Sequence, residues 1–281
     1  MLSYINGKYL PKEEITISPD DRGFLFADGL YEVIRSYDGR LFQFQEHMAR
    51  LNYGARQLRF NVTEFDSLLD VAENLIDQNG LKEGDALIYI QVTRGVAPRL
   101  HKFPPAETPL TVYATPRPFT PRRDELENGI GVLFVPDVRW ARCDIKQVGL
   151  LPNVLAHQRA VESGAAEAVF VRDGAITEGT HSNVFAVISG QVITPPRTNY
   201  ILGGITRRVV LRLCKELNFP FAERALFEHE ARRADELFIA GTTVEITPVV
   251  KVDDQEVGSG RPGILTRRLQ EAFEKFKGKQ R

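Results

Sequence analysis

Two charged side chains stand in apolar stretches of the sequence, and both are of types that take part in catalysis. Lys146 lies between Ile145 and Val148, where burial would favour the neutral amine that attacks a carbonyl carbon to form a Schiff base. Glu178 follows a predicted strand, and a carboxylate there could keep a pyridine-type ring nitrogen protonated, so that the ring accepts electrons. A snorkelling surface lysine and a solvated glutamate at a hairpin end are the simpler explanations, and each residue alone favours them.

Two segments could bind an anionic group such as a phosphate. Gly203–Thr206 contains two glycines immediately before a predicted helix, whose first N–H groups and positive dipole end attract anions. Thr242 and Thr243 offer hydroxyls and backbone donors just after a predicted strand. Arg50, on a predicted helix, could supply the opposing charge. A glycine turn before a helix and a solvated helical arginine are both common, so each feature remains open when taken alone.

A third candidate is the pair Arg99 and His101, in a proline-containing loop. Residues two apart on an extended chain face the same side, so the two side chains could both donate to one carboxylate. An exposed basic loop is the alternative, and it is the better explanation when the fold is unknown.

The composition excludes several other classes of protein. The 281 residues carry 36 Lys and Arg against 37 Asp and Glu, a net charge of -1, which argues against binding to nucleic acid or to an anionic membrane. Two cysteines, Cys143 and Cys214, rule out a disulfide framework, and the five histidines show no spacing typical of a metal site. The N-terminus lacks a signal-peptide pattern and no apolar run reaches about 18 residues. We therefore expect a soluble, cytoplasmic protein without a metal.

The elements that must position these residues are a mixture of strands and helices. Asn-Gly or Asp-Gly pairs at positions 6–7, 38–39 and 173–174, and Ser-Gly at 189–190, predict hairpins, because such pairs accept the positive φ angles of tight turns. Apolar spacing predicts helices over 46–60, 63–80 (with Thr63 as the N-cap), 153–164 and 206–217. The strands are joined mostly by hairpins, so the pattern is typical of an α+β fold and not of a doubly wound parallel sheet.

Closely spaced prolines mark a boundary between two halves of the chain. Pro116, Pro118 and Pro121 interrupt both strand and helix patterns. We expect an N-terminal α/β domain over 1–117, a linker over 118–124 and a C-terminal α+β domain over 125–281.

The order of the motifs resembles the fold-type IV pyridoxal-phosphate enzymes. The motifs are DRGFLFADGLYEVIR, EHMARL, DIKQVGLLPNVLA, EAVFVRDGAITEGTHSNVF, GGITRRVV and DELFIAGTTVEITPV, and they extend over nearly the whole chain. The family includes branched-chain aminotransferases, D-amino acid aminotransferases and aminodeoxychorismate lyases. The resemblance implies a two-domain α+β fold, with the C-terminal domain binding pyridoxal 5'-phosphate, and a homodimer.

The resemblance also implies a role for each candidate residue. Lys146 is the catalytic residue that binds the cofactor through a Schiff base, Glu178 pairs with the pyridine nitrogen, and Arg50 binds the phosphate. Leu202 packs against the ring, while Ile205, Thr206 and Thr242 surround the phosphate. The substrate-binding residues implied by the family are Tyr31, Arg99, His101 and Thr243.

The Arg-x-His pair is similar to the carboxylate trap of D-amino acid aminotransferases. The resemblance therefore implies transamination between a D-amino acid, such as D-alanine, and a 2-oxo acid, such as 2-oxoglutarate, with Arg99 and His101 reaching the neighbouring subunit's site. His181 and Gly241 depart from this branch's pattern, where small hydroxyl residues are usual. A branched-chain L-aminotransferase and an aminodeoxychorismate lyase are the alternatives, and a catalytically silent carrier of the cofactor is a rival from another class.

Overall fold

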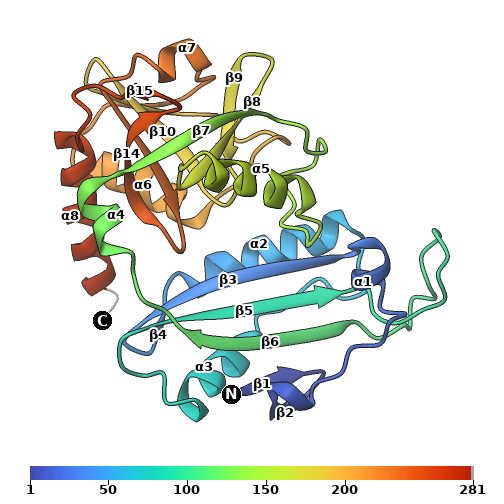
Figure 1. Cartoon of the computed structure of the whole chain (residues 1–281). Helices are drawn as coiled ribbons and strands as arrows, with labels where there is room; N and C mark the ends of the chain where they lie inside the picture. The colour runs from blue at the N-terminus through green and yellow to red at the C-terminus, as the bar shows by residue number, and fades with distance from the viewer. Residues whose placement is uncertain (280–281) are drawn as a thin grey trace. The chain divides into compact units, whose positions relative to one another are not determined.

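A computed structural model of the chain describes residues 1–279 (Figure 1). The chain divides into two compact units. Unit 1 comprises Met1–Thr120 together with Ile145–Gly149, and unit 2 comprises Pro121–Asp144 and the chain from Leu150 onward. The short segment carrying Lys146 therefore belongs to unit 1, although the chain on both sides of it belongs to unit 2.

Unit 1 is built on an antiparallel sheet of six strands in the order β2-β1-β6-β5-β3-β4. The strands are β1 (Leu2–Ile5), β2 (Lys8–Pro11), β3 (Gly29–Tyr37), β4 (Arg40–Leu41), β5 (Asp85–Thr93) and β6 (Thr111–Pro118). The helices are a short 3-10 turn η1 (Lys12–Glu14), α1 (Arg22–Phe26), α2 (Phe44–Gln57) and α3 (Leu68–Gln78).

The core of unit 1 forms where α2 and α3 cover the sheet. Alternate residues of β3 and β5 point to the same face, and on that face Leu30, Ile34 and Ile88 are buried with Met48 and Leu75 from the two helices. Burying each such side chain stabilises the fold by about 1.5–3 kcal/mol. The opposite face of β3 carries Tyr31, which is left for other contacts.

Unit 2 contains a mixed nine-stranded sheet in the order β12-β11-β10-β13-β14-β7-β8-β9, with β15 paired to β14. Its strands are β7 (Ile130–Pro136), β8 (Glu167–Arg172), β9 (Ala175–Gly179), β10 (Asn183–Ile188), β11 (Gln191–Thr194), β12 (Phe221–Glu223), β13 (Glu236–Gly241), β14 (Glu245–Val252) and β15 (Gln255–Glu256). The pairs β7–β8, β7–β14 and β11–β12 are parallel, and the others are antiparallel.

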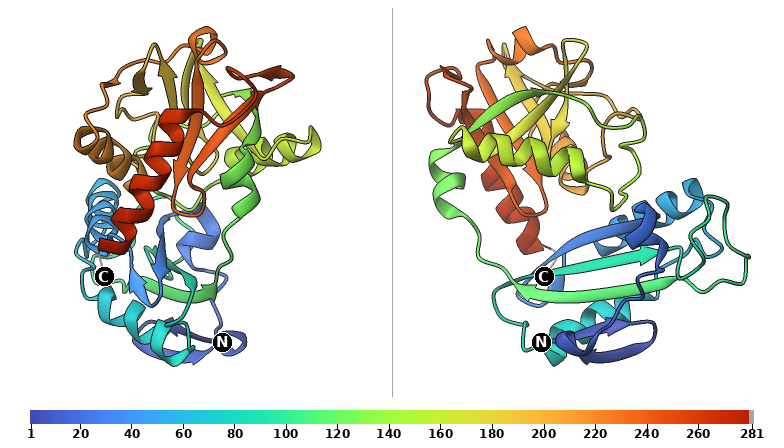
Figure 2. Two further views of the ribbon diagram at one scale, coloured as in Figure 1. Left: turned by 90° about the vertical axis from the view of Figure 1, so that its left-hand side faces the viewer. Right: turned by 45° about the vertical axis from the view of Figure 1, so that its right-hand side comes forward.

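Five helices belong to unit 2: α4 (Arg123–Asn128), α5 (Leu151–Glu162), α6 (Ile205–Glu216), α7 (Glu228–Ala231) and α8 (Ile264–Lys279). Helix α8 lies beside β13 and β14 and also contacts α6 (Figure 2, left). Helix α5 covers β7 and β8, where Ala160 packs with Ala168 and Phe170. No helix within residues 1–279 has the length and apolarity to cross a membrane.

The four predicted hairpin turns are confirmed by their backbone angles. Both central residues of each turn have positive φ, for example 46° and 88° at Asn6 and Gly7, and 51° and 77° at Asp173 and Gly174. The structure confirms the α+β class and the predicted helices over 46–60, 153–164 and 206–217 to within a few residues at each end.

The helix predicted over 63–80 begins later than expected. Thr63 is not its N-cap, since α3 starts at Leu68 after a turn. The Asn52 side chain accepts a hydrogen bond from the Phe65 backbone N–H at 3.0 Å, and the Phe65 ring is buried in the core of unit 1. These tertiary contacts hold residues 63–67 outside the helix. Helix α8 and the parallel strand pairs were not predicted.

Candidate active site

Lys146 lies against Tyr31 within unit 1. The segment Ile145–Gly149 is bonded to the start of β3, because the Tyr31 N–H donates to the Lys146 carbonyl at 3.0 Å and the Val148 N–H donates to the Gly29 carbonyl at 3.1 Å. Ile145 is buried in the core and anchors the segment. The Lys146 Nζ is 4.1 Å from the centroid of the Tyr31 ring, a position that favours a cation over the ring face. The amine is half-buried, as its apolar neighbours in the sequence predict.

Arg50 is held by a buried glutamate that sequence reasoning missed. The Arg50 guanidinium donates to both carboxylate oxygens of Glu32, each at 2.7 Å, and Glu32 Oε2 is also 2.7 Å from His47 Nδ1. Burial alone would raise the pKa of Glu32, but the charge and hydrogen bonds of Arg50, with those of His47, lower that pKa to about 2. Burial lowers the pKa of His47 below its usual value, against the opposing effect of the Glu32 charge. Arg50 is therefore oriented on α2 by an ionised partner on β3.

Arg99 and His101 lie in the loop that follows β5, which extends beyond the end of the sheet (Figure 1, right). Both side chains are exposed and both lie close to Phe26 of α1. The Arg99 guanidinium is 5.1 Å from the Phe26 ring centroid, and the His101 ring is 5.6 Å from it. The loop thus presents the two donors together, as their spacing predicts. The aromatic ring that both side chains contact is that of Phe26.

Glu178 is the last residue but one of β9 in unit 2 and is almost fully buried. Its Oε1 accepts a hydrogen bond from Arg139 Nη1 at 2.6 Å, and its Oε2 accepts from the Leu202 N–H at 2.9 Å and from Asn183 Nδ2 at 3.2 Å. Asn183 also donates to the Leu202 carbonyl at 3.0 Å, so Glu178 and Leu202 share one bridging side chain. The solvated hairpin-end carboxylate is thereby excluded for Glu178.

Arg139 is the cation that compensates the buried charge of Glu178. It also pairs with Asp137 at 2.9 Å, and it donates to the Thr177 hydroxyl and the Tyr200 carbonyl. Burial alone would lower the pKa of Arg139, but its bonds to Asp137 and the charge of Glu178 raise it above its usual value. Asp137 has a lowered pKa in turn: burial opposes the ionised form, and the contacts with Arg139 outweigh that effect. The cluster therefore keeps its charges at neutral pH.

Both predicted phosphate-binding segments of unit 2 lie next to Asn183. Helix α6 begins at Ile205 after Gly204, whose N-cap position has no side chain to accept the first N–H groups. A Cβ at Gly204 would overlap Asn183 Oδ1, so the sequence needs glycine at this close approach. Asn183 pairs with Ala240 in the β10–β13 ladder, which places Gly241 and the turn of Thr242 and Thr243 at the same end of the sheet.

Arg139, Asn183, Glu32 and His47 contact predicted site residues but were not found from the sequence. Glu32 adjoins Tyr31 in β3, and Asn183 ends the motif EGTHSN, so both lie in segments already singled out. Glu32 and Asn183 could have been identified from the sequence, because each is a polar residue in a strand whose other residues are mostly apolar. Arg139 lacks such a signal, because its loop is polar and its partner lies 39 residues away.

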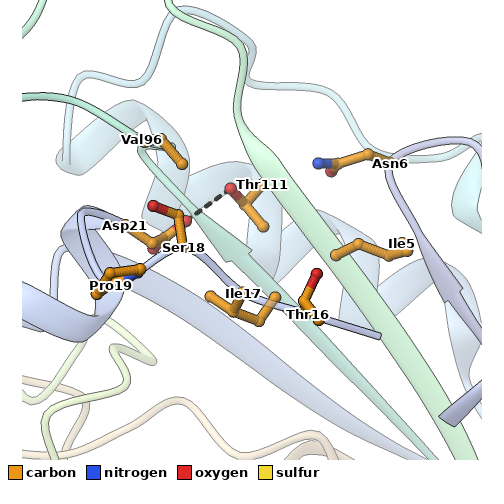
Figure 3. Close-up of a pocket in the computed structure, with 9 residues that line it drawn as sticks. All are labelled: Ile5, Asn6, Thr16, Ile17, Ser18, Pro19, Asp21, Val96 and Thr111. Atoms are coloured by element: carbon orange, nitrogen blue, oxygen red, sulfur yellow. Dashed lines mark hydrogen bonds between the residues drawn. The ribbon is translucent and has the colours of Figure 1, made fainter. Parts of the chain in front are cut away.

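Unit 1 contains a cavity of about 520 Å³ (Figure 3). It is lined by Ile5, Asn6, Thr16, Ile17, Ser18, Pro19, Asp21, Val96 and Thr111. The Asp21 carboxylate accepts hydrogen bonds from Thr111 at 2.6 Å and Thr93 at 2.9 Å, so it serves to join strands β5 and β6 to the chain before α1. None of the predicted site residues lines this cavity.

Comparison with known proteins identifies the class to which this fold and these residues belong. The chain belongs to the amino-transferase class IV family, which it matches over residues 29–252. The aminotransferases of this fold type use pyridoxal 5'-phosphate, and this confirms the predicted fold type and cofactor.

Individual relatives are similar to the chain over almost its full length. A D-alanine aminotransferase of Staphylococcus haemolyticus is 43% identical over 97% of this chain and 96% of its own. A D-alanine aminotransferase of Bacillus licheniformis is also 43% identical, over 96% of this chain and 94% of its own. Among solved structures, a branched-chain amino acid aminotransferase of Escherichia coli superposes with a TM-score of 0.90 at 30% identity, covering 97% of this chain and 93% of that one.

Proposed function

We propose that this aminotransferase moves the amino group between a D-amino acid, such as D-alanine, and a 2-oxo acid, such as 2-oxoglutarate. The observation that carries the proposal is the 43% identity to D-alanine aminotransferases along 97% of the chain. The solved branched-chain enzymes share the fold at lower identity, 30% or 26%, so they support the fold more than the substrate. The exposed pair Arg99 and His101 on one loop favours the D-amino acid branch over the branched-chain alternative.

The residues present fit pyridoxal 5'-phosphate. Unit 2 supplies a buried carboxylate, Glu178, whose negative charge is stabilised by Arg139, together with the glycine-opened N-terminus of α6. Such a carboxylate suits a protonated ring nitrogen, and such a helix start suits a phosphate. Unit 1 supplies an amine, Lys146, and a fixed guanidinium, Arg50.

We infer the following roles for these residues. When bound, the cofactor supplies an aldehyde carbon that combines with amines and a ring that accepts electrons from the substrate α-carbon. Lys146 would hold the cofactor at its Nζ, and as a free amine the same Nζ would take up and return the substrate α-proton. Glu178 keeps a proton on the ring nitrogen, and its own position is fixed by Arg139 and Asn183.

The remaining predicted residues bind the phosphate and ring of the cofactor and the carboxylate of the substrate. Arg50, Ile205, Thr206 and Thr242 hold the phosphate, and Leu202 packs against the ring. Tyr31, Thr243, Arg99 and His101 bind substrate, with the last two holding the α-carboxylate. Fixing the carboxylate on one side determines which hand of amino acid presents its α-proton to Lys146. We further propose that the enzyme is a homodimer in which the loop of Arg99 and His101 serves the neighbouring subunit.

Substrate choice is tested by steady-state kinetics with the purified holoenzyme on D-alanine, L-leucine and aminodeoxychorismate. We expect turnover of D-alanine with 2-oxoglutarate as acceptor. Arg99→Ala should raise the KM for D-alanine and for 2-oxoglutarate together, by about 30-fold or more, because both carboxylates lose a charged partner. His101→Ala should have a weaker effect, since a neutral imidazole contributes one ordinary hydrogen bond.

Lys102→Ala is the matched control, because it removes a positive charge from the same loop. We expect its kinetics to equal those of the wild type. A wild-type preference for L-leucine or for aminodeoxychorismate, or unchanged D-alanine kinetics in Arg99→Ala, would contradict the proposed function.

A further inference from the structure

Three side chains that the proposed function does not use meet in unit 2. His157 comes from α5, Glu167 is the first residue of β8, and His181 lies between β9 and β10. His181 Nδ1 is 3.0 Å from Glu167 Oε2, and His157 Nδ1 is 3.7 Å from Glu167 Oε1. One ligand atom from each of the three residues falls within 4.8 Å of the other two. The three residues are 10 or more positions apart in the sequence, so their spacing did not predict the cluster. The folding of the sheet brings them together.

Glu167 is a buried carboxylate without a permanent cation beside it. The residue is 1% exposed, and within residues 1–279 its only ion-pair contacts are with the two histidines. Its Oε1 accepts hydrogen bonds from the Ala168 N–H, the Thr180 N–H and the Thr180 hydroxyl, at 2.9, 3.2 and 2.5 Å. Its Oε2 accepts from the Ser182 hydroxyl at 2.9 Å. These neutral donors fix the carboxylate but leave its charge without a permanent positive partner.

His157 presents a buried nitrogen that lacks a hydrogen bond. Its Nδ1 is inaccessible to solvent and has no hydrogen-bond partner within the described chain, even though 39% of the side chain is exposed. A buried polar atom without a partner is costly, and an ion or a water molecule bound beside it would supply the missing partner. The His157 and His181 rings are 5.6 Å apart and perpendicular, so both ring edges can face one point near Glu167.

We propose that His157, Glu167 and His181 bind a divalent transition-metal ion of the Zn²⁺ type. Two imidazole nitrogens and one carboxylate oxygen form a ligand set that Zn²⁺ prefers, with a water molecule in the fourth position. Metal–ligand distances of about 2.0–2.2 Å require about 3.3–3.6 Å between neighbouring ligands of a tetrahedron. His181 Nδ1 is 3.0 Å from one carboxylate oxygen and His157 Nδ1 is 3.7 Å from the other, so one ion between the two rings requires the Glu167 carboxylate or the His157 ring to turn slightly.

The ion acts as a structural clamp on the segment that ends in the candidate active site. It joins α5 and β8 to the residues that follow Glu178, since Thr180, His181 and Ser182 connect Glu178 to Asn183. The fourth position is not needed for the proposed transamination, in which Lys146 is the catalytic amine. Zinc binding by His157 and His181 is therefore separate from the proposed transamination.

The test measures zinc directly, so its result does not depend on the proposed reaction. Holoenzyme stripped with a chelator is titrated with Zn²⁺ by calorimetry, and thermal unfolding is followed with and without saturating Zn²⁺. We expect one Zn²⁺ per chain and a rise in Tm of at least about 2 °C. His157→Ala and His181→Ala should each weaken this binding by at least about tenfold, since each removes a direct ligand. His229→Ala, which removes an exposed histidine elsewhere in unit 2, is the matched control and should bind as the wild type does.

A crystal structure with anomalous scattering at the zinc edge provides a second measurement. We expect one peak within coordination distance of His157, Glu167 and His181. The proposal is overturned if the wild type binds no more zinc than His157→Ala and His181→Ala, or if the peak lies at other residues. A wild type that binds zinc at this site but has no transaminase activity would contradict the proposed function. The same result would support the zinc site.

Discussion

Lys146 shows how a charged residue is held in place by its backbone. The Tyr31 N–H bonds to the Lys146 carbonyl, and the Tyr31 ring lies under Nζ, so the lysine is positioned at both its ends. This arrangement leaves the amine on the face of β3 opposite to the buried core, where a cofactor can approach it.

Lys146→Ala should abolish the visible absorption of the protein-bound cofactor and essentially all transamination, because it removes the amine that lies on the Tyr31 ring. Absorbance spectra of the purified protein and steady-state assays check this. Lys251→Ala, which removes an exposed lysine of β14, is the control and should retain both properties. If borohydride reduction of the wild type attached the cofactor to a different lysine, the assignment of Lys146 would be wrong.

Glu178 has a more strongly determined environment, with one oxygen on Arg139 and the other on Asn183 and the Leu202 N–H. Glu178→Gln should still bind the cofactor but should lower kcat by at least about 100-fold, because a neutral amide cannot stabilise the ring proton. Cofactor content and kcat for D-alanine are the measurements. Glu127→Gln, an exposed glutamate of α4, should keep the wild-type kcat, and a near-normal rate in Glu178→Gln would refute the role.

At the scale of elements, strand β3 and helix α2 are joined by a buried ion pair. Glu32 is fully buried and ionised, since Arg50 and His47 hold its pKa at about 2 against the opposing effect of burial. A folded-state pKa below the usual 4.5 means that the pair stabilises the fold above about pH 5 and that this effect is lost as pH falls towards 2.

The difference between the two pKa values of Glu32 corresponds to about 3 kcal/mol of unfolding free energy at neutral pH. Glu32→Gln should therefore be less stable than the wild type at pH 7, and the gap should shrink steadily between about pH 5 and pH 3. Urea unfolding over this pH range measures the gap. Glu73→Gln, an exposed glutamate of α3, should show a small gap that does not change with pH. A gap for Glu32→Gln that is the same at pH 7 and pH 3 would contradict the ionised pair.

The start of α6 depends on a close approach to β10. Gly204→Ala should reduce the unfolding free energy by about 1–3 kcal/mol and weaken cofactor binding, because the new Cβ displaces Asn183 from Glu178 and Leu202. Gly203→Ala is the matched control for stability, since its Cβ would meet Arg197 at an ordinary 3.5 Å. Urea unfolding and cofactor titration are the measurements, and equal losses in the two variants would show that the approach to Asn183 is unimportant.

At the scale of the whole molecule, exposed apolar side chains gather on one helix. Leu151, Val154 and Leu155 lie on one face of α5 at helical spacing and are each at least 60% exposed. Such a stripe is typical of a protein interface, and the resemblance to the family implies a homodimer.

We expect the wild type to have twice the mass of one chain by light scattering. Val154→Glu combined with Leu155→Glu should give a monomer with greatly reduced activity, because buried charges oppose association and the loop of Arg99 would lose its neighbour. Ile264→Glu, which places a charge on an exposed isoleucine at the start of α8, should remain dimeric. A monomeric wild type with full activity would refute the dimer.

Much of this molecule could be predicted from local patterns. The hairpin at Asn6 and Gly7 and the helix around Arg50 depend on neighbours within a few residues, so their sequences were sufficient. The family motifs identified the cofactor, since they carry Lys146 and Glu178 in a fixed order.

The sequence by itself therefore determined the class of fold, the family and the residue types available for catalysis. Only the tertiary structure decided which polar residues support them: Glu32 beneath Arg50, Arg139 on Glu178, and His157 and His181 around Glu167. The physical reason is that a buried charge is stable only when an opposite charge or a hydrogen-bond donor reaches it. Those partners come from other elements, and the pairing of strands, not the spacing of residues, brings them together.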